Sequence, residues 1–252
     1  MRRERAEEAA RLLSRARGGE PVGMLPPSCR PQSDADAYQI QDAVTSELGE
    51  AIGGWKVGAA SATAAAYCAP IYATMIRQSP ASYNAAELRL IGIEAEIAFR
   101  LARDLPARAA TYDLAEVTAG ASLHPVIEVV DSRYADFRSL DRSSILADNF
   151  SNGGLVYGSA VPNWGSLDLS GTMITVTEDG KPFAESSGAA ARDPLAALAD
   201  FANLMNGRGG AKAGTIVTTG SWTGMGFTKR GARILADFGP FGRVEVAFSA
   251  AD

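Results

Sequence analysis

The sequence is poor in the side chains that build disulfides and zinc sites. Its 252 residues include only two cysteines, Cys29 and Cys68, and one histidine, His124. The cysteines lack the close spacing of a thiolate metal site, and two are too few for a disulfide framework. A reducing environment is the simplest interpretation, so we predict a cytoplasmic protein.

Long apolar runs and a basic face are also missing. No segment approaches the roughly 20 apolar residues that a membrane helix requires, and the charged segment 1–19 has no apolar centre typical of a secretion signal. The 24 basic and 29 acidic residues give a formal net charge of -5, with no basic stripe interleaved with aromatic residues. We therefore expect neither a membrane nor nucleic acid as a partner.

The chain is rich in strand patterns interrupted by helices. Strands are expected in WKVGA, GIEAEIAF, HPVIEVVDS, GLVYGSA, GTIVTTGS, ARILADF and GRVEVAF, with a hairpin over 172–185 that turns at EDGK. Helices are expected over 2–17, over 33–49 and after the N-cap Asp193. The irregular mixture predicts an α+β fold. We expect a helical subdomain over 1–52 and a strand-rich catalytic domain over 53–252.

Two strands carry the first candidate site. In GIEAEIAF the side chains alternate, so Glu94 and Glu96 share one face. A solvent-facing strand carries such pairs routinely, but Glu128 lies in PVIEVV, a run apolar on both faces and typical of a buried strand. An unpaired carboxylate there costs several kcal/mol or takes up a proton. Three carboxylates suit Mg²⁺ or Mn²⁺; the alternative is that Glu128 pairs with an internal lysine or arginine such as Arg133.

Lys56 is the second candidate. It lies in GGWKVGA, where glycines permit close approach of a ligand or another strand. A desolvated lysine can move protons near neutral pH unless nearby carboxylates keep it charged. The alternative is a lysine whose ammonium reaches solvent from the end of a strand.

Seven sequence motifs follow one another along the chain. GWKVG, GIEAEIAF followed by RDLP, PVIEVVDSR, LADNFSNGG, the DGKPF hairpin, AGTIVTTGSWTG and ADFGPFGRVEVAF cover nearly the whole chain. In this order they resemble the 2-keto-4-pentenoate hydratase family of the fumarylacetoacetate hydrolase superfamily, which includes 4-oxalocrotonate decarboxylases. The resemblance implies a mixed β-roll of the fumarylacetoacetate hydrolase C-terminal type behind a helical N-terminal subdomain, usually as a homo-oligomer.

The resemblance also implies roles for individual residues. Metal ligands would be Glu94, Glu96 and Glu128, the acid/base and catalytic residues Lys56 and Ser151, and the substrate-binding residues Ser221, Thr223 and Asp148. Asp148 and Asn149 have two open interpretations, support of the site from behind or capping of a turn. One departure is the segment 67–75, YCAPIYATM, which has no acidic residue where many members carry an aspartate.

The expected reaction is metal-dependent hydration of a small 2-hydroxy-2,4-dienoic acid, or its 2-oxo tautomer, to a 4-hydroxy-2-oxo acid in aromatic catabolism. An alternative is decarboxylation of a 2-oxo-enedioate, for which Arg133 and Arg142 are candidates to bind the second carboxylate. C–C bond hydrolysis is disfavoured because no histidine–carboxylate dyad is evident, and we interpret His124 as structural. The missing acidic residue in 67–75 leaves a non-catalytic scaffold or binding relative as a further alternative.

Overall fold

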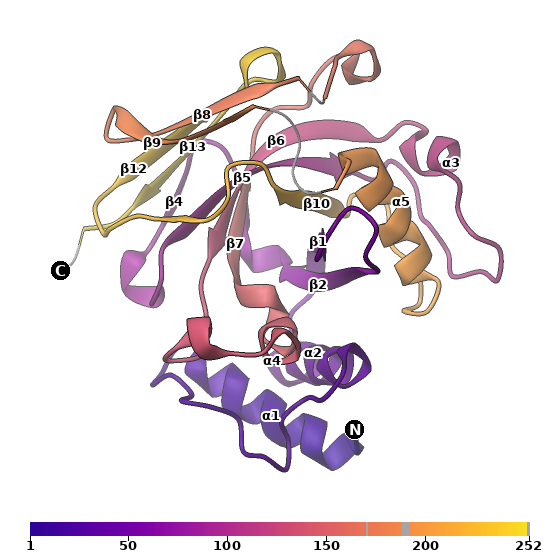
Figure 1. Cartoon of the computed structure of the whole chain (residues 1–252), viewed down its shortest axis with the longest axis vertical. Helices are drawn as coiled ribbons and strands as arrows, with labels where there is room; N and C mark the ends of the chain where they lie inside the picture. The colour runs from indigo at the N-terminus through magenta and orange to yellow at the C-terminus, as the bar shows by residue number, and fades with distance from the viewer. Residues whose placement is uncertain (170, 188–191, 251–252) are drawn as a thin grey trace.

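A computed structural model of the protein describes residues 1–169, 171–187 and 192–250 (Figure 1). The α-helices of these ranges are α1 (Arg3–Ala16), α2 (Asp34–Leu48), α3 (Leu114–Thr118), α4 (Arg142–Ala147) and α5 (Pro194–Met205). Within the described ranges, no helix combines the length and the apolar character that a bilayer crossing demands.

The strands form two sheets. The first has the order β2 (Ala66–Tyr72), β1 (Ile52–Ala59), β10 (Ile216–Ser221), β5 (Gly92–Arg100), β6 (Ser122–Val130), β7 (Asn152–Tyr157) and β3 (Ile76–Gln78), with β11 (Gly226–Phe227) also paired to β5. The second has the order β4 (Ala81–Tyr83), β13 (Arg243–Phe248), β12 (Arg233–Asp237), β8 (Met173–Glu178) and β9 (Lys181–Ser187). Both sheets mix parallel and antiparallel pairs, which confirms the predicted α+β fold.

Local sequence explains where the longer helices begin and end. The Ser33 side chain accepts a hydrogen bond from the Asp36 amide at the start of α2, and Gly49 ends that helix with φ 64°. Asp193 caps α5 in the same way, and Pro194 occupies its first turn. Both N-caps are those expected from the sequence.

The N-terminal helices lie together at one end of the molecule (Figure 1). Their apolar faces form a buried cluster that also takes in residues of β2 and α4, among them Tyr67, Ala69 and Leu146. Because this cluster contains residues from both sides of position 52, the division into a helical subdomain over 1–52 and a catalytic domain over 53–252 stays a prediction.

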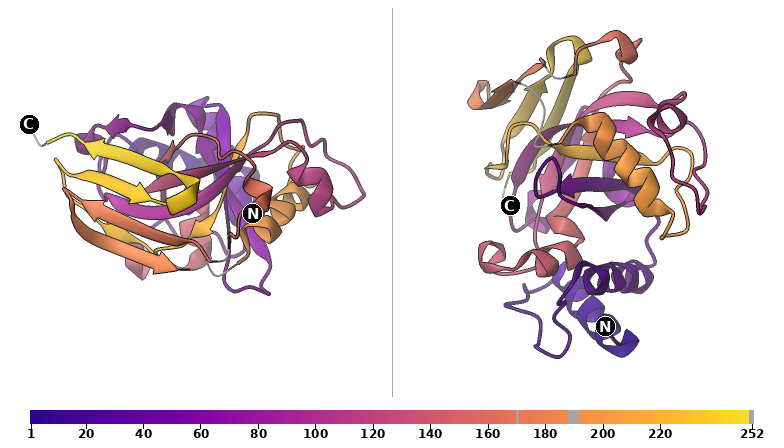
Figure 2. Two further views of the ribbon diagram at one scale, coloured as in Figure 1. Left: turned by 90° about the horizontal axis from the view of Figure 1, so that it is seen from above. Right: turned by 45° about the vertical axis from the view of Figure 1, so that its right-hand side comes forward.

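The main core lies against β5. Ile93, Ala95, Ile97 and Phe99 alternate along this strand and are all buried in one apolar cluster. Full burial of a side chain such as Phe99 contributes on the order of 2–3 kcal/mol. The five-stranded sheet packs through β13 on β6 and β7, while α5 covers β1, β2 and β10 on the other side of the molecule (Figure 2). The core therefore fixes which face of β5 its glutamates occupy.

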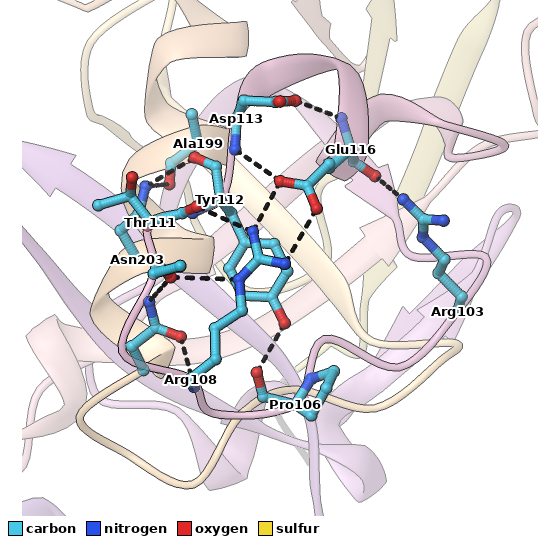
Figure 3. Close-up of polar contacts among 11 residues, drawn as sticks. Arg103, Pro106, Arg108, Thr111, Tyr112, Asp113, Glu116, Ala199 and Asn203 are labelled. Atoms are coloured by element: carbon cyan, nitrogen blue, oxygen red, sulfur yellow. Dashed lines mark hydrogen bonds and ion pairs between the residues drawn. The ribbon is translucent and has the colours of Figure 1, made fainter.

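A polar network holds the loop before α3 against α5 (Figure 3). The Arg108 guanidinium donates to both carboxylate oxygens of Glu116, at 2.9 and 2.6 Å, and lies 3.6 Å from the Tyr112 ring centroid. The Tyr112 amide donates to Asn203 Oδ1 of α5 at 2.8 Å. This network buttresses the helix that contributes part of the cavity wall described below.

Candidate active site

The candidate site lies on one face of neighbouring strands of the first sheet. Lys56 comes from β1, Ser221 from β10, Glu94 and Glu96 from β5, and Glu128 from β6. Side chains alternate along a strand, so burial of the apolar residues of β5 in the core turns both glutamates to the opposite face. That face looks into the protein, because Glu96 is 2% exposed and Glu128 is fully buried.

Strand register brings the three carboxylates together. Glu94 lies directly opposite Glu128 across the β5–β6 ladder, an arrangement that is destabilising for like charges. One carboxylate oxygen from each of Glu94, Glu96 and Glu128 can be chosen such that all three lie within 4.8 Å of one another. Such a cluster needs a compensating cation.

Lys56 supplies part of that compensation. Its Nζ lies 2.5 Å from Glu128 Oε1, although β10 and β5 separate the strands that carry the two residues. In a flat sheet, three strand spacings of about 4.8 Å would put these backbones about 14 Å apart. The pair therefore depends on the curl of the sheet. Glu128 thus gives Lys56 a carboxylate partner, although segment 67–75 contains no acidic residue.

A left-handed turn borders this ion pair. Asn149, Phe150 and Ser151 have φ of 50°, 50° and 56°, a conformation that is unfavourable for residues other than glycine. The turn directs the Phe150 carbonyl oxygen to Lys56 Nζ at 3.0 Å, with the Phe150 ring centroid 5.3 Å from the same nitrogen. A strained backbone thus contributes directly to holding the lysine.

The charges of the site shift one another's titration. Burial lowers the pKa of Lys56, but Glu128, Glu94 and Glu96 raise it by more, so the net direction is upward. Burial raises the pKa of Glu96 well above its ordinary range, and the neighbouring Glu128 and Glu94 raise it further. The pKa of Glu94 is also raised, chiefly by burial. The lysine is therefore an ammonium beside carboxylates that favour taking up a cation or a proton.

The face opens into a cavity of about 180 Å³. Its wall is lined by Lys56, Glu94, Glu96, Tyr67, Phe150, Arg192, Ala197, Thr218 and Ser221, among others. Arg192 was missed by sequence reasoning because it follows an alanine-rich segment that carries no motif. Its guanidinium pairs with Asp200 at 2.5 Å and donates to the Ala62 carbonyl at 2.7 Å, whereas its Nε–H is buried and has no partner among the described residues.

Several predicted site residues lie outside this wall. Ser151 is 4% exposed, and its buried hydroxyl has no hydrogen-bond partner in the part of the chain that is described. Thr223 Oγ1 accepts the Ala95 amide at 3.2 Å. Asp148 accepts hydrogen bonds from the Ser132 hydroxyl and the Arg133 guanidinium. His124 bonds to the Gly158 carbonyl and the Ser122 hydroxyl.

The two arginines considered for a second substrate carboxylate do not line the cavity. Arg133 is buried in an ion pair with Asp148, with Nε 2.5 Å from Oδ1, so Glu128 pairs with Lys56 and not with Arg133. Arg142 pairs with Asp34 at 2.6 Å and lies over the Tyr67 ring. Among the described residues that line the cavity, the arginine is Arg192.

The three glutamates fit a divalent cation. Their oxygens are the hard ligands that Mg²⁺ and Mn²⁺ prefer. Glu128 Oε2 is buried without any hydrogen-bond partner among the described residues, which is unfavourable for a carboxylate oxygen unless a ligand satisfies it. Glu94 is partly exposed and lines the cavity, so the cluster borders space that is open to a ligand.

The fold is of the fumarylacetoacetate hydrolase type. A fumarylacetoacetate hydrolase family protein from Yersinia pestis CO92 shares the fold, with a TM-score of 0.56 at 16% identity over 77% of this chain and 92% of that one. No family model matches the chain.

Two closer similarities narrow this class. The chain is 32% identical to 2-keto-4-pentenoate hydratase from Burkholderia vietnamiensis in an alignment of 259 positions that covers 97% of each protein. It also superposes on 4-oxalocrotonate decarboxylase from Pseudomonas putida G7, solved with magnesium and adipate, with a TM-score of 0.85, 25% identity and 98% coverage of both chains. The chain belongs to the 2-keto-4-pentenoate hydratase family.

Proposed function

We propose that the protein is a hydro-lyase that adds water to a small 2-hydroxy-2,4-dienoic acid, yielding a 4-hydroxy-2-oxo acid. The observation that carries this proposal is the buried cluster of Glu94, Glu96 and Glu128 with Lys56 paired to one of its members. The relative from Burkholderia vietnamiensis, similar along nearly its whole length, is named for a reaction of this type.

In this proposal the three glutamates hold Mg²⁺ or Mn²⁺ beside the cavity. A cation bound there would act as a Lewis acid on the adjacent carboxylate and 2-oxygen of the substrate. Gly220 donates its amide to Glu96 Oε2 at 3.0 Å, so that this carboxylate keeps a defined orientation. The glutamates thereby fix the polar end of the substrate at the closed side of the cavity.

Lys56 is the proposed acid/base residue. Ketonisation of the dienol removes the 2-hydroxyl proton and delivers a proton to the terminal carbon of the diene. Lys56 lines the cavity, and the glutamates that raise its pKa keep it an ammonium. A cation bound by these glutamates would offset their charge and lower the pKa of Lys56, so that the lysine can give up a proton and then recover one. Water then adds at C4 of the resulting unsaturated 2-oxo acid.

Ser221 is proposed to contact the substrate from the cavity wall, and Ser151, whose neighbour Phe150 lines that wall, is proposed to contact it when the substrate is bound. The Ser221 side chain lines the cavity beside the glutamates, opposite Glu96 in the β10–β5 ladder. The buried and unpartnered hydroxyl of Ser151 has hydrogen-bonding capacity that the described protein groups leave unused. Asp148 and Thr223 are proposed to support this region through the contacts described above.

The decisive experiment follows the ultraviolet absorbance of freshly generated 2-hydroxypenta-2,4-dienoate with purified protein, in Mg²⁺, in Mn²⁺ and in chelator. We expect metal-dependent decay to 4-hydroxy-2-oxopentanoate, and loss of activity in Glu94→Ala. Tight metal binding without turnover of any dienoate would instead support a non-catalytic relative.

A second candidate is decarboxylation of a 2-oxo-enedioate, favoured by Arg192. Arg192 lines the cavity, where its guanidinium would pair with a second carboxylate on the substrate. The matching structure from Pseudomonas putida G7 is that of a decarboxylase solved with a dicarboxylate, adipate. Release of CO₂ from 4-oxalocrotonate, compared with the rate of dienol consumption, decides between the two reactions.

We also propose a cytoplasmic homo-oligomer. Both cysteines are free and buried, which suits a reducing compartment. Large apolar side chains are exposed at Met24, Met173, Met225 and Phe227, which suits contacts between copies. Light scattering coupled to size-exclusion chromatography tests the oligomeric state, and a monomeric mass at micromolar concentration would contradict it.

A further inference from the structure

Asn152 is a buried residue whose side chain contacts Glu128. It begins β7 directly after the left-handed turn, and its side chain is 5% exposed. Asn152 Nδ2 donates to Glu128 Oε1 at 3.0 Å and lies 3.4 Å from the Gly154 carbonyl oxygen. Two acceptors on the same side set the orientation of the amide, because the opposite orientation would point Oδ1 at a carboxylate.

The two oxygens of Glu128 consequently have different environments. Oε1 accepts from both Lys56 and Asn152, whereas Oε2 is buried and accepts from no described residue. Rotation of the carboxylate would exchange the two oxygens, and the paired donors oppose that rotation. Lys56 alone would follow a moving carboxylate because its stem is flexible, whereas an amide at the start of a strand is fixed.

The backbone of Asn152 is itself anchored. Arg133 Nη1 donates to the Asn152 carbonyl oxygen at 2.8 Å, and Arg133 is held by Asp148 in a buried ion pair. Two residues earlier in the chain, the Phe150 carbonyl oxygen accepts a hydrogen bond from the Lys56 ammonium. Segment 150–152 thus contacts both members of one ion pair: the Phe150 carbonyl accepts from Lys56, and the Asn152 amide donates to Glu128.

We propose that Asn152 is a positioning residue that fixes Glu128 as a ligand through a single oxygen, Oε2. This inference rests on the proposed metal site. Loss of a hydrogen bond to a metal ligand typically weakens metal affinity 10- to 100-fold. We therefore expect Asn152→Ala to weaken Mn²⁺ binding by about 10- to 100-fold while the fold is retained.

The test is a double-mutant cycle on Mn²⁺ affinity, read from the electron paramagnetic resonance signal of free Mn²⁺ with no substrate present. The variants are Asn152→Ala, Glu128→Gln and the double variant, all in the full chain, with thermal unfolding as the check on folding. Asn152→Ser is carried in parallel because it leaves a smaller void. Asn203→Ala is the matched control, since the side-chain amide of this asparagine also donates to a backbone carbonyl but does so at the Tyr112 loop.

If Asn152 acts through Glu128, its replacement weakens Mn²⁺ binding in the natural protein but changes it less than about threefold when residue 128 is glutamine. The Asn203→Ala control is expected to lower the melting temperature and leave the affinity unchanged. The positioning role would be overturned if Asn152→Ala lowered Mn²⁺ affinity equally with glutamate and with glutamine at position 128, or lowered it with neither. Unchanged Mn²⁺ binding in Glu128→Gln would overturn the metal site itself, so the two failures are distinguishable.

Discussion

Replacement of Glu96 by glutamine should stabilise the metal-free protein. Glu96 is 2% exposed and shares a 4.8 Å cluster with two other carboxylates. At this separation, with an effective dielectric constant of about 20, each like-charge pair is repulsive by roughly 3 kcal/mol. Proton uptake relieves part of this, as the raised pKa of Glu96 indicates. We therefore expect a gain of about 1–3 kcal/mol, or roughly 2–10 °C in melting temperature for a chain of this size.

The gain should depend on pH. A carboxyl group whose pKa is raised on folding contributes its full stability below the unfolded pKa and loses it as pH rises through the folded pKa. Natural protein and Glu96→Gln should therefore unfold alike below about pH 4.5 and differ most at neutral pH. Glutamine retains an oxygen for the Gly220 amide, so the change removes mainly charge.

The assay is thermal unfolding with chelator and with Mn²⁺. Mn²⁺ at about 100 times its dissociation constant should stabilise the natural protein by about 2.7 kcal/mol and should have far less effect on Glu96→Gln. Glu185→Gln, at an exposed position of β9, is the matched control and should change neither quantity. A metal-free Glu96→Gln protein that melts lower than the natural protein, yet still gains stability from Mn²⁺, would refute the electrostatic reasoning.

Three further changes test other parts of the structure. Lys56→Met should lower kcat by about 10²- to 10⁴-fold at saturating Mn²⁺, and normal turnover would remove the lysine from the mechanism. Arg192→Leu should reduce kcat/KM at least tenfold for a 2-oxo-enedioate and much less for 2-hydroxypenta-2,4-dienoate; equal losses would show that Arg192 only holds the wall. Glu116, whose pKa is lowered to about 2 chiefly by its hydrogen bonds to Arg108, contributes stability above its ordinary pKa that is lost as pH falls towards 2. Glu116→Gln should therefore melt lower than the natural protein at pH 7, with the difference vanishing between pH 4.5 and 2 in a melting series.

Helix starts and the tight hairpin turn were predicted correctly, because each depends on a few neighbouring residues. The N-caps at Ser33 and Asp193 and the hairpin of β8 and β9 all lie where the sequence placed them. Strand β2 was missed, because AYCAPIY contains a proline and no alternation. Its pairing with β1 is a tertiary effect, which short-range propensity does not encode.

The site was predictable to the extent that strand alternation and burial define it. Glu94, Glu96, Glu128 and Lys56 do come together, as their placement in apolar strands indicated. The contact of Asn152 with Glu128 joins β7 to β6 and depends on register. The only hint was its position beside Ser151 in the LADNFSNGG motif. Arg192 reaches the cavity through its contacts with α5 and the loop before β2, for which the sequence has no local signal.

The curl of the sheet has a consequence for the order of events in folding. The ion pair between Lys56 and Glu128 joins residues 72 positions apart, and the strand between β1 and β5 is β10, from the C-terminal part of the chain. A chain in which Ile216–Ser221 has not yet inserted brings the lysine to none of the glutamates. The three glutamates lie on the paired strands β5 and β6, so until the sheet closes they are together without the ammonium that offsets their charge. Interactions absent from the folding transition state act on the unfolding rate, so this ion pair should prolong the lifetime of the native protein without hastening its formation.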